Sequence, residues 1–235
     1  MTSKRFEHKY WISWAQYFSL RNLLRRHLPF DKNANPQTGE YLIRSLYFDS
    51  HDFRCVQEKN NGLEFRKKYR ARCYGLDTPA SIKLEIKYRN KNRIWKQSQS
   101  ISPQEFHGFC ASPQEYQDSP FMKELSLDFI QYALRPVTIV QYTREAYVYP
   151  ASNVRITFDK YLSHSGKAHN LLESHPEISV HEGNRLILEV KYDNFLPLMI
   201  HKILSSQIYR STSISKYILC YEGAFFPSQL PYIQN

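Results

Sequence analysis

Four basic residues occupy alternate positions in one segment of the sequence: Arg66, Lys68, Arg70 and Arg72. In a β-strand, alternate residues point to the same side, so we expect these side chains to share one face. Arginine keeps its charge and binds two phosphate oxygens at once through its planar fork. The segment therefore predicts a strand that offers a cationic face to an anionic partner: a nucleic acid, an anionic membrane or a phosphate compound.

The repulsion within this face helps to distinguish a solvated strand face from a concave site that binds an anion. Side chains on one strand face lie about 6.7 Å apart, and each neighbouring pair repels by roughly 2–3 kcal/mol at an effective dielectric constant of about 20. An open surface screened by salt tolerates this repulsion, whereas a concave site requires an anion. A solvated strand face is the alternative, but such faces usually mix both signs and this one carries only cations.

The basic residues are concentrated in one part of the chain. The 235 residues include 32 lysines and arginines and 22 aspartates and glutamates, which gives a net charge of +10. The segment from Lys59 to Lys96 holds twelve of the basic residues and three acidic ones. Nearly all the net charge lies in this segment, which favours a polyanionic partner at one place.

Composition and length indicate one globular domain over residues 1–235. Hydrophobic residues make up 42% of the chain, which is too apolar for a disordered protein, and no linker divides it. No apolar run approaches the roughly 20 residues of a membrane helix, and the N-terminus lacks the apolar segment of a signal peptide. The four cysteines form no C-x-x-C pair, which argues against a zinc site or a disulfide framework. We expect a cytoplasmic protein.

A second strand within the basic segment shows the alternation most clearly. Between residues 81 and 89, Ile82, Leu84 and Ile86 alternate with Lys83 and Glu85, so one face is apolar and the other is charged. Alternation and strand-forming residues also predict strands at 4–12, 41–48, 65–74, 137–148, 153–162 and 185–192. Capping residues and apolar stripes predict helices after Ser13, Ser102, Ser112 and Ser215 and at 121–134 and 199–208.

The short connections make many of the strands antiparallel, so the predicted fold class is α+β with about seven or eight strands. If the strands close into a barrel, alternate residues face its interior. A lumen lined with cations and a few carboxylates makes a poor hydrophobic core and a good phosphate channel. The inward residues would then include Arg5, Glu7, Lys9, Arg70, Arg72, Glu85, Lys87, Arg144, Arg155, Glu189 and Lys191.

Eight short motifs, in order along nearly the whole chain, resemble those of the VTC domain. This is the polyphosphate polymerase domain of the vacuolar transporter chaperone family and its bacterial relatives, which are triphosphate tunnel metalloenzymes alongside the CYTH proteins. The resemblance implies an antiparallel eight-stranded β-barrel that forms a tunnel with flanking helices. The motifs lie at residues 5–11, 45–49, 70–75, 84–87, 142–147, 155–159, 188–191 and 215–217.

The resemblance also implies roles for single residues. Glu189 would ligate Mn²⁺ or Mg²⁺, with Glu7 and Glu85 as further candidates for the same ion. The catalytic residues that hold the triphosphate and the growing polyphosphate would be Lys9, Arg70, Arg72, Lys87, Arg144 and Lys216. With the basic segment and the inward positions, the expected substrate-binding residues are Arg5, Tyr47, Lys59, Arg66, Lys68, Arg89, Lys96, Arg155, Lys191 and Ser215.

Some of these residues have a second interpretation. Glu85 is equally a salt-bridge partner of Lys83 or Lys87 on the same strand face, and Ser215 is better explained as a helix cap than as a nucleophile. Asp49 and Asp159 are interpreted as structural residues. Arg5 stands where hydrolytic CYTH relatives have the first glutamate of a Glu-x-Glu-x-Lys signature, which argues against a two-metal hydrolase.

The resemblance implies a polyphosphate polymerase that transfers the terminal phosphate of ATP to a polyphosphate chain and releases ADP. The alternatives are hydrolysis of tripolyphosphate or a nucleoside triphosphate in the same tunnel, and a non-catalytic polyphosphate-binding protein. Nucleic acid is not expected, because Phe65, Tyr69 and Tyr88 lie opposite the cations, whereas base stacking needs both on one face. Delivery of polymer across a membrane would require a separate membrane partner.

Overall fold

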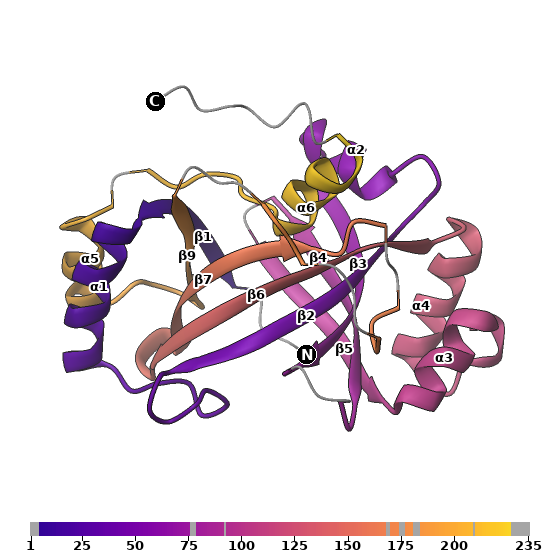
Figure 1. The fold of residues 1–235 in the computed structure, drawn as a ribbon, viewed down its shortest axis with the longest axis horizontal. Coiled ribbons are helices and arrows are strands. Elements are labelled where there is room, and N and C mark those ends of the chain that lie inside the picture. Colours follow the sequence, from indigo (N-terminus) through magenta and orange to yellow (C-terminus); the bar gives the residue numbers. More distant parts are fainter. Residues whose placement is uncertain are drawn as a thin grey trace.

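A long antiparallel sheet organises the chain, and most of the helices lie around its outer side (Figure 1). The structure is a computed structural model that describes residues 5–75, 79–91, 93–167, 170–173, 177–180, 184–208 and 210–226. In these ranges the elements are β1 (Phe6–Ser13), α1 (Trp14–His27), β2 (Glu40–Asp49), α2 (Arg54–Asn60), β3 (Phe65–Tyr74), β4 (Ile82–Asn90), β5 (Arg93–Ile101), α3 (Pro103–Ala111), η1 (Pro113–Glu115), α4 (Pro120–Gln131), β6 (Arg135–Tyr149), η2 (Ala151–Asn153), β7 (Val154–His164), β8 (Ile178–Ser179), β9 (Arg185–Tyr192), α5 (Leu198–Ser205) and α6 (Lys216–Phe225).

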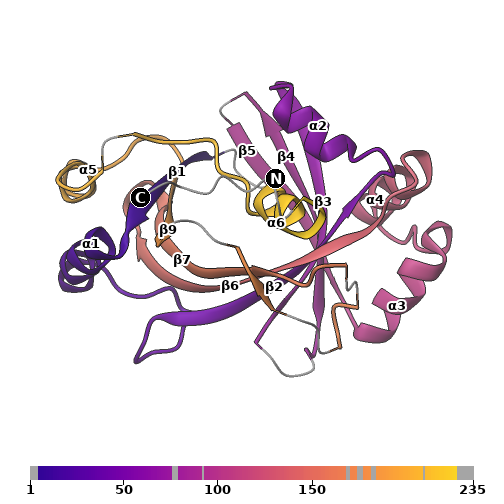
Figure 2. The ribbon, with the colours of Figure 1, turned by 45° about the horizontal axis from the view of Figure 1, so that its top comes forward.

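The strands follow the order β1-β9-β7-β6-β2-β3-β4-β5, and β8 pairs with β7. Every pairing in this path is antiparallel, which confirms the predicted α+β class. The sheet curls strongly, so its two arms face each other, and α6 lies between them in the turned view (Figure 2). This curl turns the basic face of β3 toward the interior.

The two edge strands meet at one point. Arg5 and Ile94 exchange two backbone hydrogen bonds, of 2.9 and 3.1 Å, and this bridge links the start of β1 to β5. Among the described residues, β1 and β5 are joined by this bridge alone. The sheet is therefore an eight-stranded path whose two edges meet at one bridge, and not the continuous barrel that we expected. Beyond the bridge, the segment before α6 covers the edge of β1, because the Thr212 amide donates to the Lys9 carbonyl at 2.8 Å.

Four elements were not predicted from the sequence, and one of them is the short 3-10 helix η2. β5 lacks an apolar alternation, because the polar run from Gln97 to Ser100 interrupts it. α2 begins after Phe53, whose left-handed backbone provides no side-chain cap, so it carries no start signal. β8 has two residues and lies in a stretch expected to be a loop. Of the described helices, none is both long enough and apolar enough to cross a membrane.

The hydrophobic core lies outside the curled sheet, between the strands and the helices. One cluster packs α3 and α4 against β3 and β4, and includes Tyr69, Ile86 and Leu125. A second cluster packs α1 and α5 against β7 and β9, and includes Leu20 and Leu188. Because the apolar residues of each strand point to these helices, the alternate charged residues must point to the interior.

We expect Leu125→Ala to lower the free energy of unfolding by about 2–5 kcal/mol, because it leaves a cavity beneath α4. Leu127 on the same helix is 50% exposed, whereas Leu125 is 2% exposed, so Leu127→Ala should cost less than about 1 kcal/mol. Urea denaturation of both variants measures the difference. Equal losses would contradict the placement of the core outside the sheet.

Candidate functional site

The inner face of the sheet encloses two contiguous cavities. One, of about 110 Å³, extends toward α2 and α6, and the other, of about 410 Å³, extends toward Tyr41 and Tyr74. They adjoin each other, because seven residues line both: Glu7, Arg70, Arg72, Lys87, Ile94, Arg144 and Lys191.

The structure brings the predicted site residues together around this space. All six predicted catalytic residues line the smaller cavity. The ten predicted substrate-binding residues line one cavity or both, although they come from widely separated parts of the sequence. Of the three predicted metal ligands, Glu7 and Glu189 line the smaller cavity, whereas Glu85 lines neither of the two.

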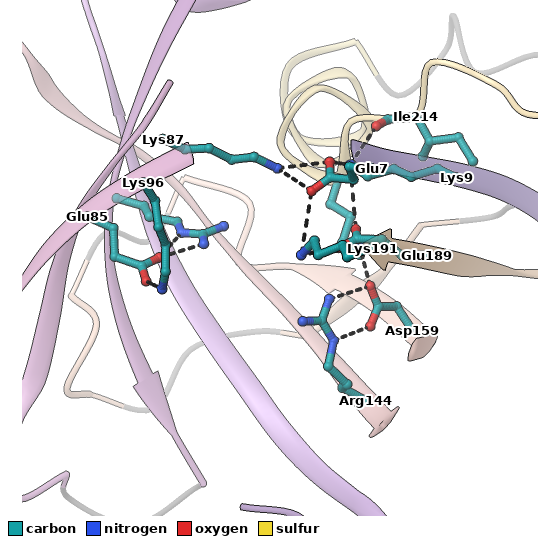
Figure 3. A network of polar contacts seen from close by, with 12 residues as sticks. Glu7, Lys9, Glu85, Lys87, Lys96, Arg144, Asp159, Glu189, Lys191 and Ile214 are labelled. Carbon is teal, nitrogen blue, oxygen red and sulfur yellow. Dashed lines mark hydrogen bonds and ion pairs between the residues drawn. The ribbon is translucent and has the colours of Figure 1, made fainter. Parts of the chain in front are cut away.

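Two carboxylates share a group of lysines at the centre of the site (Figure 3). Lys87 Nζ lies 3.0 Å from both carboxylate oxygens of Glu7, and Lys9 Nζ lies 3.3 Å from that carboxylate. Lys191 forms ion pairs with both Glu7 and Glu189. The strand register explains the arrangement, because Glu7 faces Lys191 and Lys9 faces Glu189 across β1 and β9.

Burial and neighbouring charges shift the pKa values of the carboxylates and lysines at this centre. Burial and the Glu189 carboxylate raise the pKa of Glu7, but the ammonium groups of Lys87 and Lys9 outweigh both and lower it. Burial lowers the pKa of Lys87 to about 7, although Glu7 opposes the shift. The carboxylates therefore remain ionised at neutral pH, and the lysine charge is sensitive to the loss or gain of an anion.

Asp159 fixes two of the predicted catalytic residues. Its carboxylate accepts from Arg144 Nε at 2.6 Å and from Arg144 Nη2 at 2.8 Å, and it forms an ion pair with Lys216. The Lys216 ammonium also lies 5.0 Å from the ring centre of Tyr142. These contacts agree with the interpretation of Asp159 as a structural, hydrogen-bonding residue, and the groups that this buried side chain orients line the cavity.

Glu85 acts as a counter-ion beneath the cavity wall. Its carboxylate accepts from Arg70 Nε at 2.6 Å and pairs with Lys96, and Arg72 lies 4.0 Å away. Burial alone would raise its pKa, but Arg70 and the other cations lower it. Arg70 also donates to the Tyr47 hydroxyl at 3.0 Å. Glu85 is therefore an ion-pair residue, but its partners are Arg70 and Lys96 and not Lys83 or Lys87 as predicted, and Lys87 pairs with Glu7 instead. Metal binding by Glu85 stays a prediction.

The donor set at the centre fits a metal that is bound together with phosphate. Among the described residues, no three His, Cys, Asp or Glu side chains are grouped to hold an ion by themselves. Mg²⁺ commonly takes one or two carboxylates and completes its shell with water and substrate phosphate oxygens. Glu7 and Glu189 provide such a pair. Thr157, which faces Glu189 in the β7–β9 ladder, has a buried hydroxyl without a hydrogen-bond partner.

Sequence reasoning missed several contributors to the site, among them Tyr41, Thr157 and the Ile214 carbonyl. Thr157 belongs to the strand predicted at 153–162, but its position beside Glu189 depends on the register of β9. The carbonyl of Ile214 accepts from Lys9 Nζ at 3.0 Å, and no side-chain pattern signals a backbone acceptor. Asp49 agrees with its structural interpretation, because it accepts from the Tyr217 hydroxyl at 2.8 Å and the Cys55 amide at 2.9 Å.

Comparison with protein families matches residues 4–225 to the VTC domain. The chain belongs to the VTC domain family. A search of curated proteins finds no match. The match covers nearly the whole chain and confirms the resemblance that the eight motifs predicted.

Solved structures share the fold of this VTC domain. An adenylyl cyclase candidate from Hippeastrum, described as having a dominant triphosphatase activity, superposes with a TM-score of 0.57 at 14% identity, over 97% of this chain and 99% of that one. An adenylate cyclase candidate from Bacillus halodurans superposes with a TM-score of 0.58 at 15% identity, over 96% and 98% of the chains. At this identity the likeness shows the fold alone, which is the triphosphate tunnel fold.

We expect Glu85→Gln in this VTC domain to lower the free energy of unfolding by about 3–5 kcal/mol, because the buried Arg70 guanidinium loses its counter-charge. Glu64 provides the matched control. Its side chain is 68% exposed and pairs with Lys91 at 3.6 Å, so Glu64→Gln should cost about 1 kcal/mol or less. Chemical denaturation measures both, and similar values would exclude Glu85 as a buried counter-ion.

A substitution at Lys68 is expected to stabilise the fold, whereas Glu85→Gln is expected to destabilise it. Burial and the nearby Lys9 ammonium lower its pKa from 10.5 to about 7. The unfolded chain therefore binds more protons between these pH values, and the destabilising effect of Lys68 is complete below pH 7 and fades as pH rises. We expect Lys68→Met to raise the melting temperature, by more at about pH 6 than at about pH 9. A lower melting temperature at both pH values would refute this.

Proposed function

We propose that this VTC domain is a metal-dependent polyphosphate polymerase, which transfers the terminal phosphate of ATP to the end of a polyphosphate chain and releases ADP. The observation that carries the proposal is the convergence of eleven lysines and arginines on one cavity around the Glu7–Glu189 pair. Family membership supports the same activity.

The cations suit the chemistry of phosphoryl transfer. This reaction needs little covalent chemistry from the protein and depends mainly on positioning and charge neutralisation. Asp159 holds Arg144 through two hydrogen bonds, and Glu85 and Tyr47 hold Arg70. These guanidinium groups are fixed before substrate binds, so they do not need to reorganise as charge develops on the phosphate oxygens.

Glu7 and Glu189 would hold Mn²⁺ or Mg²⁺ together with the phosphate oxygens. When bound, the ion would neutralise negative charge on the transferring phosphate. The lysines that now pair with the two carboxylates would then contact phosphate instead. Lys87 and Lys9 are long, flexible cations, which suits such an exchange of partners.

Hydrolysis of a triphosphate in the same cavity is the second candidate. The observation that favours it is the pair of adjacent carboxylates, which can orient a water molecule as well as a metal. The Hippeastrum protein with the same fold is described as a triphosphatase. Hydrolysis would release free phosphate without long polymer.

The deciding assay incubates the protein with ATP and Mn²⁺ and resolves polyphosphate, ADP and free phosphate. We expect long polymer, and we expect Lys87→Met and Glu189→Gln each to reduce its rate by about 100-fold or more. Lys123 is exposed on α4, so Lys123→Met provides the matched control and should retain the rate.

The same assay separates the alternatives. Free phosphate without polymer would establish a triphosphatase, and polyphosphate binding without either product would establish a non-catalytic binding protein. Polymer formation at the unchanged rate in Lys87→Met would refute the assignment of the cavity as the reaction site.

A further inference from the structure

Three segments that lie far apart in the sequence form one end of the molecule and contain no acidic residue. They are residues 14–30, which include α1, residues 146–158, which include the turn between β6 and β7, and residues 194–208, which include α5. Both views show α1 and α5 side by side at this end (Figures 1 and 2). The Gln16 side chain donates to the Gln207 carbonyl at 2.6 Å, so the start of α1 meets the end of α5 and the two helices run antiparallel.

The turn between β6 and β7 holds the other two segments together. The Val148 amide donates to the carbonyl of Pro29, just after α1, at 3.1 Å. The Ser152 hydroxyl accepts from the amides of Asn194 and Phe195, just before α5, at 3.2 and 3.1 Å. The end of α1 and the start of α5 therefore lie against the same turn, which fixes the backbone that leads into α5.

Exposed apolar side chains gather at the start of α5. Phe195 is 60% exposed, Leu198 is 68% exposed and Met199 is 37% exposed. The opposite face of the helix, with Ile200 and Leu204, already packs in the second core cluster. Because the backbone before the helix is hydrogen-bonded, the fold itself holds these apolar side chains in water. Such a group is typical of a surface that contacts another molecule.

Basic side chains lie on the same two helices. Arg25, Arg26 and His27 form the last turn of α1, and Lys202 lies one turn after Leu198 on α5. Within the described ranges, no carboxylate lies within ion-pair distance of Arg25, Arg26 or Lys202. Basic residues in a last turn also stabilise a helix, but that effect does not require three segments to exclude acidic residues. This end is therefore a cationic surface that also presents an apolar group.

We propose that this end of the molecule docks on an anionic lipid bilayer. Such a bilayer meets both requirements at once, because its headgroups attract lysine and arginine and its interfacial region accepts apolar side chains. Phe195, Leu198 and Met199 enter that region, and the basic side chains contact the headgroups. A second copy of this chain is a poorer partner, because two cationic surfaces repel each other. None of these residues lines either cavity, so the inference is independent of the proposed function.

Vesicle co-sedimentation of the whole chain tests the proposal without nucleotide or metal. The vesicles contain phosphatidylcholine alone, or phosphatidylcholine with roughly one third phosphatidylserine. We expect binding to the anionic vesicles only. Phe195→Ser/Leu198→Ser should weaken it by about tenfold or more, because two apolar side chains leave the interface. Arg25→Gln/Arg26→Gln should also weaken it by about tenfold or more, because two attractive charges are lost.

Two matched variants make the same changes elsewhere on the molecule. Leu127→Ser/Ile130→Ser removes two apolar side chains that are 50% and 54% exposed on α4. Lys123→Gln/Arg135→Gln removes two exposed charges, one from α4 and one from the start of β6. Both variants should bind the anionic vesicles as the unchanged chain does.

A third variant at this end, Met199→Ser/Lys202→Gln, keeps the test valid if circular dichroism shows that one of the first two does not fold. Equal losses in the matched variants would assign the binding to the net charge of the whole protein and overturn the inference. No binding to anionic vesicles, or equal binding to neutral ones, would also overturn it. The same holds for dimers, seen by analytical ultracentrifugation without vesicles, that Phe195→Ser/Leu198→Ser dissociates, because this end would then belong to a second copy.

Discussion

The structure depends on carboxylates that form ion pairs with the lysines and arginines on the inward faces of its strands. A buried charge costs several kcal/mol unless it is paired and hydrogen-bonded. Glu7, Glu85, Asp159 and Glu189 provide this pairing, and each contacts at least two basic side chains. Without these carboxylates, the basic face of β3 could not close onto the other strands.

This constraint also determines where the hydrophobic core lies. Because the interior is occupied by ion pairs, the apolar face of every strand must be covered from outside. The helices do this in two groups: α3 and α4 over β3 and β4, and α1 and α5 over β7 and β9 (Figure 1). The stability of the site therefore rests on four helices that contribute no residue to the two cavities, whereas Lys59 of α2 and Lys216 of α6 line the smaller cavity.

The sequence predicts the parts of this arrangement that arise from local periodicity. Alternation identified β3 and β4 and the inward face of each, and serine caps marked the starts of α1, α3 and α6. It could not predict pairings that depend on strand register. Asp159 looked structural because Arg144 faces it only through the β6–β7 ladder, and the single Arg5–Ile94 bridge is visible only once the sheet has curled.

The cations of the site fall into two kinds, and the difference has a chemical consequence. Arg70 and Arg144 have fixed carboxylate partners beneath the cavity wall, so they hold one geometry whether or not an anion is bound. Lys9, Lys87 and Lys191 instead share the carboxylates of Glu7 and Glu189. An incoming phosphate therefore replaces a carboxylate partner rather than neutralising a bare charge, so its net gain is moderate. Moderate affinity allows a bound phosphate compound to exchange, because an anion held by bare cations alone would be released slowly.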